Sequence, residues 1–235
     1  MEWSGYKWRS GQPWGNFHPN NLKSWYDPTA FSVDEEGVLN MTVHENPKEF
    51  DVDGKKVIIP NGVGLICSDE TDFGYGYYEA ECLMPSGPAL WPAFWLSAVD
   101  SWPPEIDIVE AYSGKKGNYW GDFLNWRKIE TNLHYGVQVD GKHPSTGAES
   151  PCFFRKRPNK KYIKYFMLWT EDEIMIKYDE RIVTHITDPE ILKWYKGKKM
   201  NVIFNVSLQE DIFKGVDIKS PFKIKNFKYE KLGEE

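Results

Sequence analysis

The chain has 235 residues, a net charge of −6 and 11 tryptophans. Its length suits one domain with a large core, and we expect a single domain over residues 1–235. The negative charge argues against nucleic acid as the main partner. No apolar run approaches the roughly 20 residues that span a bilayer, so no membrane partner is expected.

Short strand-like runs separated by turn residues recur along the chain and predict an all-β sandwich. Asp53-Gly54 and Asp140-Gly141 predict hairpin turns. The only predicted helix covers residues 188–196, with Asp188 as its cap and Pro189 in its first turn. The predicted strands are 38–43, 56–59, 64–68, 77–84, 93–98, 106–111, 131–135, 162–170, 173–178, 181–186, 200–206 and 222–229.

One of these strands carries a cluster of acids, because residues 105–110 read Glu-Ile-Asp-Ile-Val-Glu. Isoleucine and valine favour strands, and alternate side chains of a strand share a face, so Glu105 and Asp107 point the same way. Glu110 has the opposite parity, and a buried unpaired carboxylate is costly. A β-bulge at residues 108–109 would reset the alternation. We therefore predict three acids on one open face, above an apolar floor.

Three neighbouring acids suit the hydrolysis of glycosidic bonds. That reaction needs one carboxylate as nucleophile or base and one protonated carboxyl as acid. Carboxylates held close together disfavour joint ionisation, so one of them keeps its proton near neutral pH. The alternatives are a strand face that is merely acidic, or a calcium site.

The sequence around the acids favours the glycosidic interpretation. Residues 90–96 read Leu-Trp-Pro-Ala-Phe-Trp-Leu, and Trp102 precedes two prolines that lead into Glu105. Sugar rings stack on indoles, so we expect Trp91 and Trp102 to contact substrate, whereas Trp95 is expected to be structural. Strand parity places Phe94 on the face opposite Trp91 and Trp95, but it does not say which face is buried.

The motifs together resemble glycoside hydrolase family 16. They are Phe-Gly-Tyr-Gly-Tyr-Tyr-Glu-Ala-Glu at 73–81, the tryptophan-rich run at 90–96, Trp-Pro-Pro-Glu-Ile-Asp-Ile-Val-Glu at 102–110, Thr-Asn-Leu-His-Tyr-Gly at 131–136 and Trp-Thr-Glu-Asp at 169–172. The similarity runs from about residue 60 to 206. The bulged spacing resembles the laminarinase, agarase and carrageenase branches, whereas lichenases and xyloglucan-modifying members usually lack the extra residue.

This resemblance implies a β-jelly-roll sandwich of the concanavalin A type, with a glycan cleft on its concave sheet. It implies retaining, endo-acting hydrolysis of β-linked glucans or galactans. Carried over by position, Glu105 is the nucleophile, Asp107 the helper between the acids and Glu110 the general acid/base. His134 is expected to line the cleft near Glu110. Retention places the two glutamate carboxyl groups about 5–5.5 Å apart.

The substrate is less well defined by the sequence than the reaction. The tryptophan-proline context favours a β-1,3-glucan or a mixed-linkage β-1,3-1,4-glucan. Where glucanases of the family often have Asn-Leu-Ala-Val-Gly-Gly, residues 205–210 read Asn-Val-Ser-Leu-Gln-Glu, which leaves a galactan of the agarose, porphyran or carrageenan type open. Trp120 and Trp126 are further candidates for substrate binding, and the basic residues beside them suit either a solvated loop or a rim for an anionic galactan.

No cofactor is required for this chemistry. Asp51-Val52-Asp53-Gly54 begins like a calcium loop but lacks the later ligands, so a hairpin is the better interpretation. Members of the family often carry a structural calcium ion, whose ligands we cannot place here. Cys67 and Cys82 are expected to be buried thiols, and the three cysteines have no metal-binding spacing.

The expected partner is a polysaccharide, and we expect the protein to act as a monomer. The first residues have no signal-peptide pattern. Because polysaccharides are too large to import, we expect an extracellular or periplasmic protein whose signal peptide is missing from this sequence. The main rivals are a glycan-binding lectin of the same fold, which has no need for three acids, and a transglycosylase with the same residues.

Overall fold

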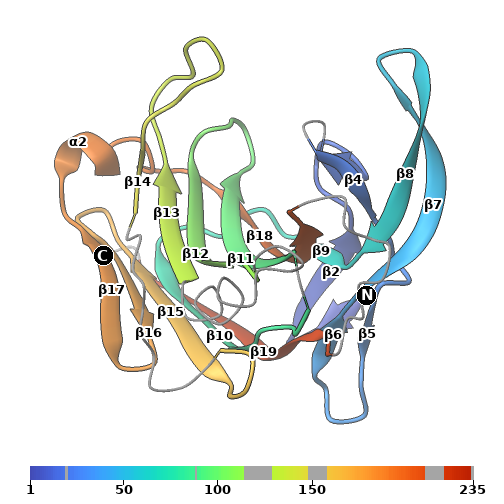
Figure 1. Cartoon of the computed structure of the whole chain (residues 1–235). Helices are drawn as coiled ribbons and strands as arrows, with labels where there is room; N and C mark the ends of the chain where they lie inside the picture. Colours follow the sequence, from blue (N-terminus) through green and yellow to red (C-terminus); the bar gives the residue numbers. More distant parts are fainter. Residues whose placement is uncertain (19–20, 88, 114–128, 148–157, 210–219, 234–235) are drawn as a thin grey trace.

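The computed structural model describes residues 1–18, 21–87, 89–113, 129–147, 158–209 and 220–233. Two large antiparallel sheets stack against each other, and a smaller sheet rises beside them (Figure 1). The predicted β-jelly-roll sandwich is therefore confirmed. No helix among the described residues is long and apolar enough to cross a membrane.

The first sheet carries the acids. Its 8 strands, in spatial order, are β1 (Glu2–Trp3), β2 (Tyr6–Ser10), β9 (Leu65–Ser68), β18 (Met200–Leu208), β11 (Leu90–Ala98), β12 (Glu105–Ala111), β13 (Ile129–His134) and β14 (Ser145–Thr146).

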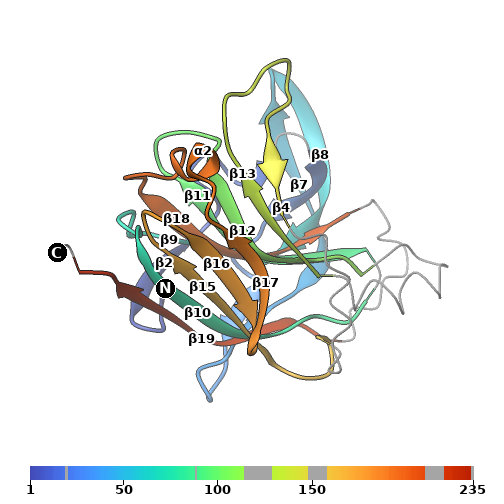
Figure 2. The ribbon, with the colours of Figure 1, turned by 90° about the vertical axis from the view of Figure 1, so that its left-hand side faces the viewer.

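The second sheet packs against the first and lies below it in both views (Figure 1 and Figure 2). Its 7 strands, in spatial order, are β17 (Arg181–Ile186), β16 (Ile174–Tyr178), β15 (Ile163–Trp169), β10 (Gly76–Leu83), β19 (Phe222–Lys231), β6 (Leu39–Met41) and β5 (Phe31–Val33).

The third sheet flanks one end of the first. Its 4 strands are β3 (Phe17–His18), β4 (Asn21–Tyr26), β8 (Lys55–Val63) and β7 (Val43–Val52). The Asn21 amide donates to the carbonyl of Leu208, and the Lys23 ammonium donates to that of Gln209. This contact lies where the sequence departs from the family pattern, so β4 borders the acid-bearing sheet at that end.

Each predicted strand run coincides with a strand, whereas β1 to β5, β14 and all but the first residue of β7 were not predicted. Asp53-Gly54 forms the β7–β8 hairpin turn, with both residues at positive φ (53° and 76°) as a primed turn requires. The helix α2 (Pro189–Leu192) is shorter than predicted, and the Asp188 side chain caps it through a bond from the Glu190 amide.

The core fills the space between the two large sheets. Phe94 on β11 stacks on Phe204 of β18 with ring centroids 4.4 Å apart, and Phe227 of β19 meets both rings edge-on. All three rings are buried. Since Phe94 points into this core, its neighbours Ala93 and Trp95 lie on the opposite face of β11, where the acids are found.

Candidate active site

A β-bulge in β12 lies where the sequence predicts it. Against β13, Asp107 pairs with Asn132 and Glu110 pairs with Glu130, so two residues of β12 oppose one residue of β13. Against β11, Asp107 pairs with Trp95 and Glu110 with Ala93, and Ile108 is passed over. Partners in register share a face, and Ala93 and Trp95 have the same parity. Glu110 therefore lies on the face of Asp107 and Glu105.

We call this the acidic face, and the strand register defines its members. One row runs Asn201, Ser97, Glu105, His134, Ser145 across the sheet. The next row runs Arg9, Cys67, Ile203, Trp95, Asp107, Asn132. The third row runs Leu65, Asn205, Ala93, Glu110, Glu130.

Two buried tyrosines hold β12 to β13. The Tyr178 hydroxyl, from β16 in the opposite sheet, lies 3.0 Å from the carbonyl of Ile108 and 3.1 Å from that of Glu130. The Tyr195 hydroxyl lies 3.3 Å from the carbonyl of Glu105 and 2.8 Å from that of His134. A bulge interrupts the ladder of backbone bonds, and buried carbonyls need partners. Tyr178 supplies one at the bulge itself.

Glu105 stands at one end of the cluster between an indole and an imidazole. Trp102 Nε1 donates to Glu105 Oε2 at 3.0 Å. Nε2 of His134 lies 3.5 Å from Glu105 Oε1 and 3.3 Å from Asp107 Oδ2. The sequence prediction placed His134 near Glu110, which is wrong: its antiparallel partner is Glu105. Parity identified the correct face, but only the register between β12 and β13 determines the neighbour.

Glu110 stands at the other end and is held by one of its two oxygens. Trp91 Nε1 donates to Glu110 Oε1 at 2.9 Å, and the Tyr112 hydroxyl lies 3.3 Å from the same atom. Trp91 and Tyr112 also pack together, with ring centroids 5.4 Å apart. Because both donors use Oε1, a proton on this carboxyl group belongs on Oε2.

The acids are recessed and less open to solvent than the sequence analysis expected. Asp107 is 3% exposed and Glu110 is 9% exposed. Burial raises the pKa of Glu105 and of Asp107 well above its ordinary value, and the neighbouring carboxyl adds to each shift. Burial also raises the pKa of Glu110, whereas the bonds from Trp91 and Tyr112 oppose this rise. The cluster therefore retains protons at pH values where free carboxyl groups are ionised.

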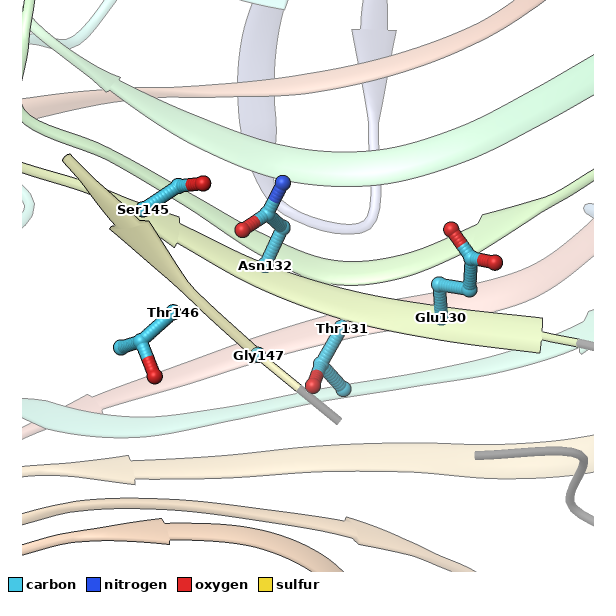
Figure 3. Close-up of a pocket in the computed structure, with 6 residues that line it drawn as sticks. All are labelled: Glu130, Thr131, Asn132, Ser145, Thr146 and Gly147. Atoms are coloured by element: carbon cyan, nitrogen blue, oxygen red, sulfur yellow. The ribbon is translucent and has the colours of Figure 1, made fainter. Parts of the chain in front are cut away.

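A pocket of about 420 Å³ opens along β13 and β14 (Figure 3). Glu130, Asn132 and Ser145 point to one side of these strands, and Thr131 and Thr146 to the other. Gly147 lies so close to β13 that a Cβ atom there would stand 2.1 Å from the carbonyl oxygen of Thr131. Its position allows β14 to approach the strand that borders the acids.

The sequence analysis missed several residues of this site. Glu130 and Asn132 have the parity of His134, so the alternation that grouped Glu105 with Asp107 could have found them. The contribution of Tyr112 follows from its position two residues after Glu110. Nothing in the local sequence indicates Tyr178, because it reaches the bulge from the other sheet.

The other predicted substrate residues have mixed positions. Trp91 and Trp102 both lie beside acids, and Trp102 is 43% exposed. Trp95 is buried on the acidic face, where its indole N–H donates to Asn205, in agreement with a structural role. Trp120 and Trp126 lie outside the described residues, as do the basic residues beside them.

Metal binding has one geometric candidate in the described part of the chain. Ligand atoms of Glu105, Asp107 and His134 lie within 4.8 Å of one another. One nitrogen and two carboxylates do not resemble the six to eight oxygens that calcium prefers. We therefore assign no ligands to the structural calcium ion that members of the family often carry. Cys67 and Cys82 are buried free thiols, as predicted, and Cys152 lies outside the described residues.

The chain is similar to known proteins in sequence and in fold. Endo-1,3-1,4-beta-glycanase ExsH of Rhizobium meliloti (strain 1021) is 27% identical over 198 residues, which are 80% of this chain but 38% of that protein. The structure of SCLam, a non-specific endo-beta-1,3(4)-glucanase, has a TM-score of 0.72 at 21% identity and covers 96% of this chain and 85% of its own. Porphyranase B from Zobellia galactanivorans has a TM-score of 0.70 at 19% identity, covering 95% and 85%.

At 21% and 19% identity, the similarity to these two structures supports the fold alone. The family follows from the sequence itself, because residues 13–213 match the description Glycosyl hydrolases family 16. That match includes every strand of the acidic face from β9 to β18. The chain belongs to glycosyl hydrolase family 16.

Proposed function

We propose that the chain is a retaining, endo-acting glycoside hydrolase that cleaves internal β-1,3 or mixed β-1,3-1,4 linkages of a glucan. The observation that carries this proposal is the bulge in β12, which brings Glu110 onto the face of Glu105 and Asp107. A lectin on the same scaffold would have no use for three nearly buried acids, each of which opposes folding when it is ionised.

Glu110 is the proposed general acid/base. Its raised pKa keeps a proton available, and the bonds from Trp91 and Tyr112 to Oε1 leave that proton on Oε2. Glu110 donates it to the glycosidic oxygen as the bond breaks. In the second step the ionised Glu110 takes a proton from water as the water attacks the anomeric carbon, and the bond from that carbon to Glu105 breaks.

Glu105 is the proposed nucleophile, and Asp107 is its helper. Glu105 attacks the anomeric carbon and forms a covalent glycosyl-enzyme. A nucleophile must be ionised. The nearby His134 and the hydrogen bond from Trp102 oppose the rise that burial and the Asp107 carboxyl group impose on the pKa of Glu105. A protonated Asp107 lets Glu105 carry the one negative charge that the pair tolerates, since two adjacent buried carboxylates resist joint ionisation.

The choice of a glucan rests on the relatives and on the aromatic flanks. ExsH is described as an endo-1,3-1,4-beta-glycanase, and Trp91 and Trp102 stand beside the outer two acids, where they can stack on sugar rings. A galactan is the alternative substrate. The departure from the family pattern at residues 205–210 and the fold shared with porphyranase B favour it.

A polysaccharide screen tests the function. The wild-type chain and the Glu105→Gln variant are incubated with laminarin, lichenan, agarose, carrageenan and porphyran, and new reducing ends are measured. We expect reducing ends from laminarin or lichenan with the wild type only. Binding without reducing ends on every polymer would favour the lectin, and longer glycan products would favour a transglycosylase.

The stereochemistry tests the mechanism separately. A retaining enzyme releases the β anomer first, which proton NMR detects before mutarotation, and its two glutamate carboxyl groups lie about 5–5.5 Å apart. An initial α anomer, or a separation of about 8 Å or more in a crystal structure, would reject the double displacement. Because such polymers are too large to import, we further propose that the enzyme acts outside the cytoplasm.

A further inference from the structure

His143, in the segment between β13 and β14, contacts the acidic cluster indirectly. A tight turn at Asp140-Gly141 reverses the chain, and the Tyr135 amide then donates to the carbonyl of Pro144. The segment rises above β13 and returns along β14 (Figure 1). This return brings Nε2 of His143 to 2.6 Å from Nδ1 of His134.

The protons of the two rings can be assigned from their neighbours. Nε2 of His134 lies 3.3 Å from Asp107 Oδ2 and 3.5 Å from Glu105 Oε1, so both carboxyl groups favour a proton on this nitrogen. Asp107 Oδ2 is buried and has no hydrogen-bond partner in the described part of the chain. A neutral His134 then has a bare Nδ1, which must accept a proton that His143 Nε2 donates. Asn132 Nδ2 lies 3.1 Å from His134 Nε2, and because two donors cannot face each other this assignment requires the amide turned by a half-turn, with its oxygen towards His134.

The surroundings of His143 fit this assignment. In the neutral ring that donates from Nε2, Nδ1 carries no proton. That nitrogen is buried and has no hydrogen-bond partner in the described part of the chain. The opposite tautomer would bury an unpaired N–H group there, which proteins rarely tolerate. Burial and the neighbouring His134 also lower the pKa of His143, which favours its neutral form.

We propose that His143 is a positioning residue that holds His134 in the neutral Nε2–H tautomer, so that the ring carries its proton on the nitrogen beside Asp107 and Glu105. This inference rests on the proposed function, because it concerns how the nucleophile keeps its charge. His143 also meets Trp102 edge-on, with ring centroids 4.6 Å apart, and Trp102 donates to Glu105. His143 therefore contacts both Trp102, which donates to Glu105, and His134, whose Nε2 lies 3.5 Å from Glu105 Oε1.

The titratable groups that face the histidine pair come from three places. Glu105 and Asp107 face it from β12, with Glu110 further along the same strand. The Tyr195 hydroxyl bonds to the backbone carbonyl of His134. Asp140 and Lys142 belong to the same segment as His143, and both are exposed.

The test replaces His143 in the full chain by leucine, which cannot donate, and by glutamine, whose amide can. His185→Leu is the matched control, because His185 is on β17 of the opposite sheet and pairs with Glu173. Nitrogen-15 NMR of the imidazole groups reports the tautomer of His134. The pH profile of kcat/KM on the best polymer of the screen reports the ionisation of Glu105.

We expect the Nε2–H tautomer of His134 in the wild type, in His185→Leu and in His143→Gln. In His143→Leu we expect this tautomer to be lost and the acidic limb of the kcat/KM profile to move to higher pH. We also expect kcat to fall about 10- to 100-fold, the size of effect seen when partners that orient other functional imidazoles are removed. A wild-type His134 protonated on Nδ1 would overturn the proposal, as would an unchanged tautomer and profile in His143→Leu.

The two readouts separate this inference from the function. If no polymer is cleaved, the proposed function fails, whereas the NMR result still decides the tautomer. If His143→Leu does not fold, the wild type and His143→Gln decide the question. Glutamine keeps a donor at this position, so a changed His134 tautomer in His143→Gln would contradict the proposal that a donor at position 143 is sufficient.

Discussion

The two large sheets treat their outward-facing carboxylates in opposite ways. On the seven-stranded sheet, Glu79 and Glu81 of β10 meet Lys164 and Lys225 at 3.1 and 2.8 Å, and these pairs are open to solvent. On the acidic face, Glu105, Asp107 and Glu110 are more deeply buried. In the described part of the chain no lysine or arginine pairs with them, and His134 lies within 4.0 Å of Glu105 and Asp107.

The exposed ion pairs of the seven-stranded sheet keep that surface soluble, whereas the buried acids of the acidic face are suited to chemistry. Exposed ion pairs contribute at most about 1 kcal/mol each. Buried carboxyl groups without a cation keep raised pKa values and oppose folding once they are ionised. The same strand alternation thus gives the seven-stranded sheet an inert outward face and the eight-stranded sheet a reactive one.

Removing the proposed nucleophile should have the largest effect. We expect Glu105→Gln to lower kcat by at least about 10⁴-fold, because nucleophile substitutions in other hydrolases have effects of this order. Binding of laminarin, measured by calorimetry, should remain largely intact. Glu81→Gln on the outer sheet is the control and should keep full activity. A Glu105→Gln enzyme with wild-type rates would refute the role of this residue.

Asp107→Asn should lower activity but stabilise the fold at neutral pH. The folded protein holds the proton of Asp107 more tightly than the unfolded chain, so stability falls as the pH rises above about 4, the ordinary pKa of aspartate. Asparagine removes this dependence. Each kcal/mol gained raises the Tm by roughly 2–4 °C at this chain length.

The Tm difference should vanish near pH 3, where both states bind the proton. Calorimetry of Asp107→Asn and wild type at pH 3 and pH 7 checks this. An Asp107→Asn protein less stable than the wild type at pH 7 would show that the aspartate is stabilised by a partner.

The two indole donors should control opposite limbs of the pH profile. Trp91→Phe removes a bond to ionised Glu110, so its pKa rises further and the alkaline limb of kcat/KM moves to higher pH. Trp102→Phe removes a bond to ionised Glu105, so its pKa also rises and the acidic limb moves to higher pH. The first variant widens the profile and the second narrows it. Movement of the same limb in both would contradict the assigned roles.

The smallest effect should come from the outer sheet. Replacing Lys164 by methionine breaks its exposed pair with Glu79, and we expect a loss of at most about 1 kcal/mol in the free energy of unfolding. Urea denaturation measures this loss, and kcat should not change. A fall in kcat would mean that the two faces are coupled more closely than their exposure suggests.

The sequence was enough to predict the strands around the acids and the bulge, because a costly parity conflict at Glu110 had one simple solution. It was not enough to place His134 beside Glu105, since strand register depends on contacts between distant segments. For the same reason His143 and Tyr178 went unnoticed. The short N-terminal strands were also missed: β1 has 2 residues and β5 has 3, too few to show an alternation.

The Tyr178 hydroxyl connects the seven-stranded sheet to the strand that carries the acids. It spans the sandwich to reach the kinked backbone at Ile108, and it grips the facing strand at Glu130. A displacement of β16 would therefore act through this side chain on the backbone of β12 and β13. Substitutions on β16 thus offer a way to alter the spacing of the acids without changing any residue on the acidic face.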